Sequence, residues 1–206
     1  MTRADDIRKA ALESLQQYEV LMLNGHFDFG NGYHGQVYLN PHQLFSHPAR
    51  IWRFAQDLSD ILPPSILSRT EVVAGPATGG ALLAHTVAGL LDSRRELSQP
   101  DMMFAPFGAN PDGTPCLSRF YREQLRGRRV LIVDDIRNTG QTFTRCVELV
   151  RDSGGEVIAT AEICDRLESV ADAGVPNFAL AEYPAPENHP AASCPLCQAG
   201  VPVATF

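Results

Sequence analysis

The sequence has 206 residues, 44% of them hydrophobic and 20% charged, and a formal net charge of −7. This length suits one α/β domain with a buried core, and the lack of a long apolar run or a secretory signal excludes a membrane protein and favours the cytoplasm. The negative charge opposes binding to nucleic acid or to an anionic membrane surface. Five cysteines in a chain of this size indicate reduced thiols rather than a disulfide framework.

The N-terminal third predicts two helices separated by an irregular β-segment. Apolar residues recur at helical spacing over residues 5–23, which indicates an amphipathic helix. Residues 25–40 mix glycines with alternating aromatic and aliphatic side chains, as a hairpin does. Ser46 and Pro48 resemble a helix start, and we expect that helix to end at about Leu62, because two prolines follow.

Beyond residue 70, strand-like and helical runs alternate in the order EVVAG, ALLAHTVAGLL, MMFAPF, RRVLIVDD, residues 141–153 and EVIATAEIC. Alternation of this kind requires crossover connections, and it predicts an α/β fold with a central, mainly parallel sheet flanked by helices. Ligands of such sheets bind at loops that leave the carboxyl ends of the strands. In this sequence those loops are GPATGG and DDIRNTGQT.

The second of these loops follows two adjacent carboxylates, Asp134 and Asp135. Two carboxylates at a strand end can accept hydrogen bonds from vicinal hydroxyls, such as those of a ribose. The polar turn after them offers N–H groups and hydroxyls at a helix N-terminus, where the macrodipole favours a phosphate. The candidate phosphate ligands in this turn are Asn138, Thr139, Gly140, Gln141 and Thr142. The segment therefore predicts a site for a pentose phosphate.

Three other interpretations of this acidic segment were weighed. VLIVDD also opens receiver domains of response regulators, but the roughly 70 residues that follow it here are too few for that domain. An acidic strand end of the Walker type would need a GxxxxGK[ST] loop, which the sequence lacks. The third interpretation, a turn with only a structural role, remains an alternative, although two acids at one strand end repel each other unless something binds them.

The glycines of GPATGG permit a close backbone approach to an anion. Together, a hydrophobic strand with two acids, the threonine- and glycine-containing turn, and GPATGG about 55 residues upstream resemble the type I phosphoribosyltransferase family. That resemblance implies that the acidic pair holds the ribose diol and that the turn at 138–142 holds the 5-phosphate. It assigns the diphosphate to the loop residues Ala77, Thr78, Gly79 and Gly80.

The segment GHFDFGNGYHGQVYLN resembles the hood of the orotate branch of that family. It implies a small N-terminal hood, with Tyr33, His34 and Tyr38 as candidate base-binding residues. Gly30 stands where many orotate enzymes have lysine or threonine, so the accepted base stays open. We expect one domain over residues 1–206, with a core at 46–175 and a hood formed by residues 1–45 and the tail 176–206.

The stretch APFGANPDGTPCLSRFYREQLRG, between Met103 and Arg129, is predicted to be a long loop, and long loops in compact domains are usually functional. The resemblance implies a mobile lid over the diphosphate, often reaching a neighbouring subunit. Arg119 is its first candidate as a catalytic side chain, and Arg122 is the second, for the diphosphate. A solvated basic surface is the alternative for both arginines.

The predicted activity is transfer of ribosyl 5-phosphate from phosphoribosyl diphosphate to a nitrogenous base in a homodimer, and the resemblance implies that this base is orotate. Magnesium (Mg2+) would act through the substrate, with Asp134 as a candidate protein contact. A purine-type phosphoribosyltransferase and a non-catalytic regulatory protein that binds phosphoribosyl diphosphate are the alternatives. Cys194 and Cys197 form a single CxxC, which supplies two ligands where a structural zinc site needs four, so a packed tail is favoured over a metal or redox site.

Overall fold

A computed structural model describes residues 2–30, 32–96, 98–168 and 171–205. Its centre is a six-stranded sheet in the order β10-β9-β8-β5-β6-β7. All neighbouring strands of this sheet pair in parallel except β7, which is antiparallel to β6. The strands are β5 (Val72–Pro76), β6 (Met103–Ala109), β7 (Pro115–Cys116), β8 (Arg129–Arg137), β9 (Glu156–Asp165) and β10 (Asn177–Glu182). The predicted α/β fold with a mainly parallel central sheet is confirmed.

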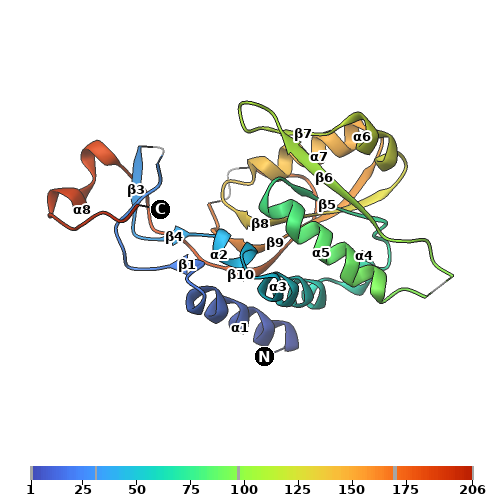
Figure 1. Cartoon of the computed structure of the whole chain (residues 1–206), viewed down its shortest axis with the longest axis horizontal. Helices are drawn as coiled ribbons and strands as arrows, with labels where there is room; N and C mark the ends of the chain where they lie inside the picture. Colours follow the sequence, from blue (N-terminus) through green and yellow to red (C-terminus); the bar gives the residue numbers. More distant parts are fainter. Residues whose placement is uncertain (1, 31, 97, 169–170, 206) are drawn as a thin grey trace.

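Helices cover both faces of this sheet (Figure 1). One face packs against α1 (Arg3–Gln17), α3 (Pro48–Ile61) and α5 (Gly79–Ser93), and the other packs against α7 (Gln141–Asp152). Two shorter helices, α4 (Pro64–Leu67) and α6 (Arg119–Leu125), lie in connections between strands. Among the described residues, no helix is long and apolar enough to cross a membrane.

Alternation along the buried strands explains why the core has two halves. In β8, Leu131 and Val133 belong to the apolar cluster under α1, α3 and α5, whereas Val130 and Ile132 belong to the cluster under α7. Successive side chains of a strand point to opposite faces, so a strand covered on both faces must be apolar at every position. The uninterrupted run VLIV therefore marks a central strand.

The hood lies beside the sheet and carries the C-terminal segment with it, at the left of Figure 1. It contains the antiparallel pair β1 (Leu21–Met22) and β4 (Tyr38–Leu39), followed by α2 (His42–Phe45). Its tip is a second sheet in the order β11-β3-β2, next to the short helices of the tail. These elements are β2 (Phe27–Asp28), β3 (Tyr33–Gly35), β11 (His189–Pro190), the 3-10 helix η1 (Ala191–Ser193) and α8 (Pro195–Gln198).

Several boundaries differ from those predicted. Helix α1 starts earlier, because Thr2 and Asp5 form a capping box, and it ends at Gln17, before the left-handed Glu19. Helix α3 is capped by His47 rather than Ser46. Strand β10 pairs with β9 in the central sheet, so the core continues beyond residue 175 and the tail begins after Glu182.

Candidate functional site

A cavity of about 390 Å³ opens at the carboxyl ends of β5 and β8, and we call it the central cavity. It is lined by Pro41, His42, Phe45, Pro76, Ala77, Thr78, Gly79, Leu82, Gly108, Ala109, Gly113, Pro115, Asp134, Asp135 and Thr142. The two loops singled out in the sequence therefore meet at one place, as expected for the carboxyl edge of a parallel sheet.

The acidic pair forms one wall of the central cavity. Burial raises the pKa of Asp134 well above its ordinary value, and repulsion from Asp135 raises it further. Burial also raises the pKa of Asp135. An Oδ1 atom of Asp134 accepts a 2.9 Å hydrogen bond from the Asp135 N–H, and Asp135 accepts one of 2.8 Å from the Ile136 N–H. Strand β8 continues through the pair to Arg137, so the carboxylates lie within the strand rather than at its end.

The glycines of the first loop allow it to pack directly on these carboxylates. A Cβ atom at Gly79 would lie 2.1 Å from Oδ2 of Asp135 and 2.6 Å from the Phe45 ring. A Cβ atom at Gly80 would lie 2.6 Å from Oδ1 of Asp134. The close approach requires glycine at both positions, and it leaves backbone rather than side chain facing the cavity.

The polar turn at 138–142 is braced from outside the cavity. Gly140 has a φ of 82° and is the N-cap of α7, which begins at Gln141 as predicted. Arg137 forms a 2.8 Å ion pair with Asp165, and Thr139 accepts a 3.0 Å hydrogen bond from the Ala171 N–H. The first N–H groups of a helix have no partner within it, so this N-terminus offers donors that suit an anion.

A second cavity of about 480 Å³ continues from the central one toward the hood, and we call it the hood cavity. Pro41 and Asp135 line both cavities. The remaining residues of the hood cavity are Phe29, Tyr38, Leu39, Ile136, Asn138, Arg166, Glu168 and Asn188. Asp135 thus stands between a site with anion-binding loops and a site with aromatic walls.

Arg166 places a buried positive charge in the hood cavity. Its side chain is only 12% exposed, and Nη2 lies 2.8 Å from Oε1 of Glu168. Among the described residues, its Nε has no hydrogen-bond partner. A buried guanidinium with an unpartnered donor can bind an anion, and an anionic ligand in this cavity would have to share Arg166 with Glu168, which lines the same cavity.

Of the three predicted base-binding residues, only Tyr38 lines the hood cavity, where its ring stacks on Phe29 with centroids 6.1 Å apart. Tyr33 is 47% exposed on β3. His34 is buried, but its ring contacts His26 and Cys197 in the hood tip. The structure therefore does not bring Tyr33 or His34 to this cavity.

Comparison with known proteins decides the family. The Phosphoribosyl transferase domain family matches residues 44–173, which carry both loops and the acidic pair. The chain belongs to this family. An orotate phosphoribosyltransferase of Caldanaerobacter subterraneus subsp. tengcongensis is 33% identical over 196 residues, 95% of each chain. One of Erythrobacter litoralis is 34% identical over 161 residues, 78% of each chain.

Solved structures agree on the fold. The orotate phosphoribosyltransferase of Aeropyrum pernix matches with a TM-score of 0.61 and 21% identity, over 82% of this chain and 92% of that one. The Mycobacterium tuberculosis enzyme, solved in complex with 5-phospho-α-D-ribosyl 1-diphosphate, matches with a TM-score of 0.56 and 18% identity, over 86% of this chain and 89% of that one. The phosphoribosyl transferase fold thus extends beyond residues 44–173 into the hood.

The segment that was predicted to be a long lid loop is more regular than expected. Strands β6 and β7 form a hairpin whose tip is closed by a 2.8 Å hydrogen bond from the Gly113 N–H to the Asn110 carbonyl. Asp112 accepts hydrogen bonds from the N–H and hydroxyl of Thr114, and helix α6 follows. The Pro-Asp-Gly run, interpreted as part of an irregular loop, is instead the turn of a hairpin.

The two lid arginines lie in α6, away from the residues that line the central cavity of the same chain. Arg119 is 93% exposed at its side chain and pairs with Glu123 at 2.9 Å. The Nε–H of Arg122 donates to the Leu117 carbonyl at 2.9 Å. Within one chain the structure does not bring either arginine to the predicted site.

Two site residues were missed in the sequence. His42 follows Pro41 in α2 and lines the central cavity, where its charge lowers the pKa of Asp135 against the effect of burial. Arg166 follows the carboxyl end of β9. Arg166 could have been identified from the sequence, because it comes one residue after a buried strand and so lies at the same sheet edge as the acidic pair.

Proposed function

We propose that this protein transfers ribosyl 5-phosphate from phosphoribosyl diphosphate to orotate. The observation that carries the proposal is the junction of the two cavities at Asp135. The central cavity offers N–H groups of the glycine loop and of the α7 N-terminus, which suit the diphosphate and the 5-phosphate of the substrate. The hood cavity offers an aromatic wall and a buried guanidinium. A sugar held at the junction has its C1 atom at the boundary between leaving group and base.

The sugar phosphate is recognised by acceptors and donors on neighbouring loops. Asp134 and Asp135 accept hydrogen bonds from the two ribose hydroxyls, and the turn at 138–142 holds the 5-phosphate at the N-terminus of α7. The loop from Ala77 to Gly80 holds the diphosphate through backbone N–H groups, because the missing side chains at Gly79 and Gly80 admit it next to the acidic pair. The named complex of the Mycobacterium tuberculosis relative supports this ligand.

Orotate is favoured over a purine because it carries a carboxylate. Arg166 supplies a buried cation in the hood cavity, and Tyr38 and Phe29 supply a flat apolar wall for a ring. Gly30 stands where many orotate enzymes have lysine or threonine, and we propose that Arg166 takes the place of that side chain as the contact for the carboxylate. Relatives named orotate phosphoribosyltransferase at 33% and 34% identity support the same substrate.

The reaction forms a bond from a ring nitrogen of orotate to C1 of the ribose as the bond from C1 to the diphosphate oxygen breaks, and the bonding electrons leave with the diphosphate. Positive charge grows on the sugar in the transition state. Asp134 and Asp135 hold the ring beside that charge, and positioning of both substrates supplies much of the acceleration. Mg2+, when bound to the substrate, would neutralise the charge of the departing diphosphate, and the hard carboxylate oxygens of the pair fit such an ion.

A homodimer would give the lid arginines a role. Arg119 is exposed on α6, and its ion pair with Glu123 contributes little stability because both side chains are in water. Its guanidinium can therefore leave Glu123 and reach a second chain. We therefore place Arg119 and Arg122 of one subunit over the diphosphate of its neighbour. The cytoplasm is the proposed location, as the substrate is an intracellular metabolite.

A base panel tests the proposal. The protein is incubated with phosphoribosyl diphosphate, Mg2+ and one of orotate, uracil, hypoxanthine or xanthine, and release of diphosphate is measured. We expect release with orotate and little with the neutral bases. Release with hypoxanthine or xanthine in place of orotate would establish a purine-type enzyme. Calorimetric binding of phosphoribosyl diphosphate without release for any base would establish the regulatory protein instead.

A further inference from the structure

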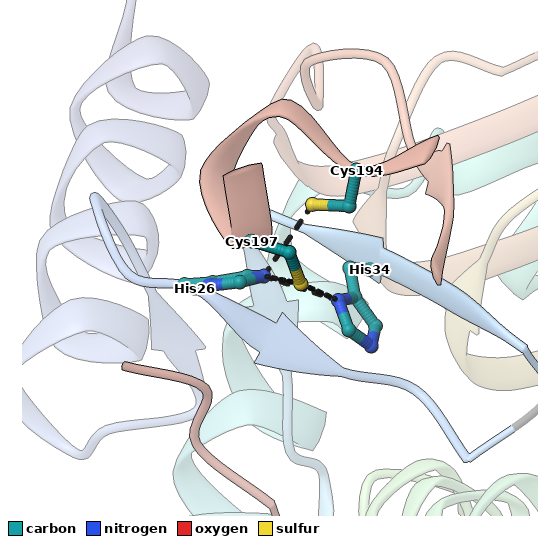
Figure 2. A group of neighbouring side chains, drawn as sticks. All are labelled: His26, His34, Cys194 and Cys197. Atoms are coloured by element: carbon teal, nitrogen blue, oxygen red, sulfur yellow. Dashed lines mark hydrogen bonds between the residues drawn. The ribbon is translucent and has the colours of Figure 1, made fainter. Parts of the chain in front are cut away.

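Four side chains of metal-ligand type converge in the hood tip, and none of them lines the hood cavity. They are His26, His34, Cys194 and Cys197, and one ligand atom from each lies within 4.8 Å of the others. Figure 2 shows the two imidazoles approaching from the hood strands and the two thiols from the tail that folds over them. We call these four residues the hood cluster.

Four of the six ligand-to-ligand distances within the hood cluster match the edges of a tetrahedron around one ion. Nε2 of His26 lies 3.1 Å from Nδ1 of His34 and 3.4 Å from Sγ of Cys194. Sγ of Cys197 lies 3.6 Å from Nε2 of His26 and 3.3 Å from Nδ1 of His34. Zinc bonds of about 2.3 Å to sulfur and about 2.0 Å to nitrogen imply tetrahedral edges of about 3.3 Å between nitrogens and about 3.5 Å between nitrogen and sulfur.

The outward nitrogens of both rings have partners suited to zinc-bound histidines. Nδ1 of His26 lies 2.9 Å from the Val201 carbonyl, which can only accept, so this nitrogen carries the proton and Nε2 presents a lone pair to the cluster. Nε2 of His34 lies 3.9 Å from the carboxylate of Asp28. A carbonyl and a carboxylate behind the rings are the usual outer partners of metal-binding imidazoles.

Hydrogen bonds alone satisfy this arrangement poorly. Nε2 of His26 has one lone pair, yet His34, Cys194 and Cys197 all approach it within 3.6 Å. One lone pair accepts one good hydrogen bond, so two of these three contacts would lack an acceptor lone pair. A cation at the centre satisfies all four groups at once.

The hood tip has little apolar core of its own. Its buried side chains include His26, His34 and Cys194 beside the apolar Phe27, and among the described residues neither apolar cluster of the core contains a member of β2, β3, β11 or α8. Its strands are two or three residues long. Short elements without an apolar core usually need a staple such as a structural metal.

We propose that the hood cluster binds one Zn2+ ion in a closed structural site. Two thiolates and two imidazoles in a tetrahedron are a zinc donor set, and four protein ligands leave no open position for catalysis. The ion would join His26, just before β2, and His34 in β3 to Cys194 and Cys197 at α8. His26 and Cys194 are 168 positions apart in the sequence. The sequence-based preference for a packed tail missed the second pair of ligands, which His26 and His34 supply.

Metal analysis of the protein as purified, without added metal, tests this site. We expect about one zinc per chain by mass spectrometry of the elements. The metal-free wild-type protein should take up about one equivalent of Co2+ and develop the intense visible bands of a tetrahedral thiolate site. A wild-type protein that holds no zinc and takes up no Co2+ would overturn the proposal, as would stoichiometric iron in place of zinc.

Matched substitutions assign the ligands. Cys197→Ser and His34→Gln should each lower the bound zinc at least tenfold after dialysis, whereas Cys116→Ser and His189→Gln should keep it. His189 pairs with His34 across β11 and β3 and is not in the hood cluster, so it is a close control. Zinc loss that is as large in His189→Gln as in His34→Gln would contradict this ligand set.

Hydrogen exchange distinguishes a structural role from a surface contaminant. Removal of zinc from the wild-type protein by a chelator should lower amide protection at least tenfold in residues 21–40 and 183–205 and leave β5, β8 and β9 protected. Restored protection on adding zinc, and not magnesium, would support the site. Unchanged protection in the hood tip after complete zinc removal would overturn it.

Discussion

The central sheet and the hood tip are held together by different means. In the sheet, strands such as β8 and β9 are nine and ten residues long and place apolar side chains on both faces, and helices cover them. In the hood tip, the strands have two or three residues, and three of the buried side chains belong to the hood cluster of histidines and cysteines.

The contrast teaches where this protein can tolerate change. The sheet holds its site with burial that is spread over many residues, so single changes at the acidic pair should affect chemistry more than folding. On the proposed zinc site, the stability of the hood tip depends on four groups around one point, so loss of a single ligand should release the whole tip. The predictions below test the sheet side of this comparison and the border between the two regions.

The largest expected effect is on the reaction. Asp135→Asn should lower kcat at least about 100-fold, because the residue stands at the junction of the cavities beside the developing charge. The melting temperature should not fall, since the change removes repulsion from Asp134. Asp152→Asn, on the exposed end of α7, is the control and should leave kcat unchanged. Equal losses in both variants would refute the placement of the diol.

The next effect is on stability and depends on pH. Burial raises the pKa of Glu162 to about 8 from an ordinary 4.5, and its Oε2 has no hydrogen-bond partner among the described residues. The contribution of Glu162 to the stability of the fold is fully present below pH 4.5, the ordinary pKa that it has in the unfolded chain. That contribution is lost as the pH rises through about 8, the pKa in the folded protein.

Glu162→Gln should therefore match the wild-type protein near pH 4.5 and exceed its stability at pH 7 by on the order of 3 kcal/mol. Urea unfolding at both pH values measures the difference. Gln should keep the hydrogen bond from Asn177, which is 2.8 Å long in the wild-type protein. A difference that does not grow with pH would mean that Glu162 is ionised in the folded protein.

A third effect is expected at the border between sheet and hood. Arg166→Gln should raise KM for orotate by about 10- to 100-fold, the value of one or two charged hydrogen bonds, and change KM for phosphoribosyl diphosphate much less. Steady-state kinetics with each substrate varied in turn gives both values. A larger rise for phosphoribosyl diphosphate would move Arg166 from the base to the sugar phosphate.

The smallest effects come from two glycines of the same helix, α5. A Cβ at Gly79 would clash with the Asp135 carboxylate, so Gly79→Ala should cost about 1–3 kcal/mol of stability or displace the acidic pair and raise KM for phosphoribosyl diphosphate. A Cβ at Gly89 meets nothing within 4 Å, so Gly89→Ala should stabilise by up to about 1 kcal/mol. Melting curves that rank the two variants the other way would contradict the close packing of this loop.

The sequence predicted what depends on local pattern. The strand VLIV and the start of α7 at Gln141 were placed correctly, because burial on two faces and helix capping leave marks on neighbouring residues. The acidic pair was predicted at the end of the strand, whereas β8 continues through it to Arg137. The meeting of GPATGG with the acidic pair followed from a general rule for parallel sheets.

What depends on distant partners was missed. Strand β10 joins the sheet only through its pairing with β9, and the lid hairpin exists only because Gly108 pairs with Cys116. The hood cluster draws on residues 26–34 and 194–197, and neither segment alone carries a zinc motif. Such contacts have no periodicity that could be recognised in one segment.

The arrangement of both cavities is tested most directly by a crystal structure of the wild-type protein with bound orotidine 5-monophosphate. We predict the ribose hydroxyls on Asp134 and Asp135, the phosphate in the turn at 138–142, and the base carboxylate on Arg166 beside Tyr38. A nucleotide bound with its base in the central cavity, or with both carboxylates turned away from the sugar, would contradict the account.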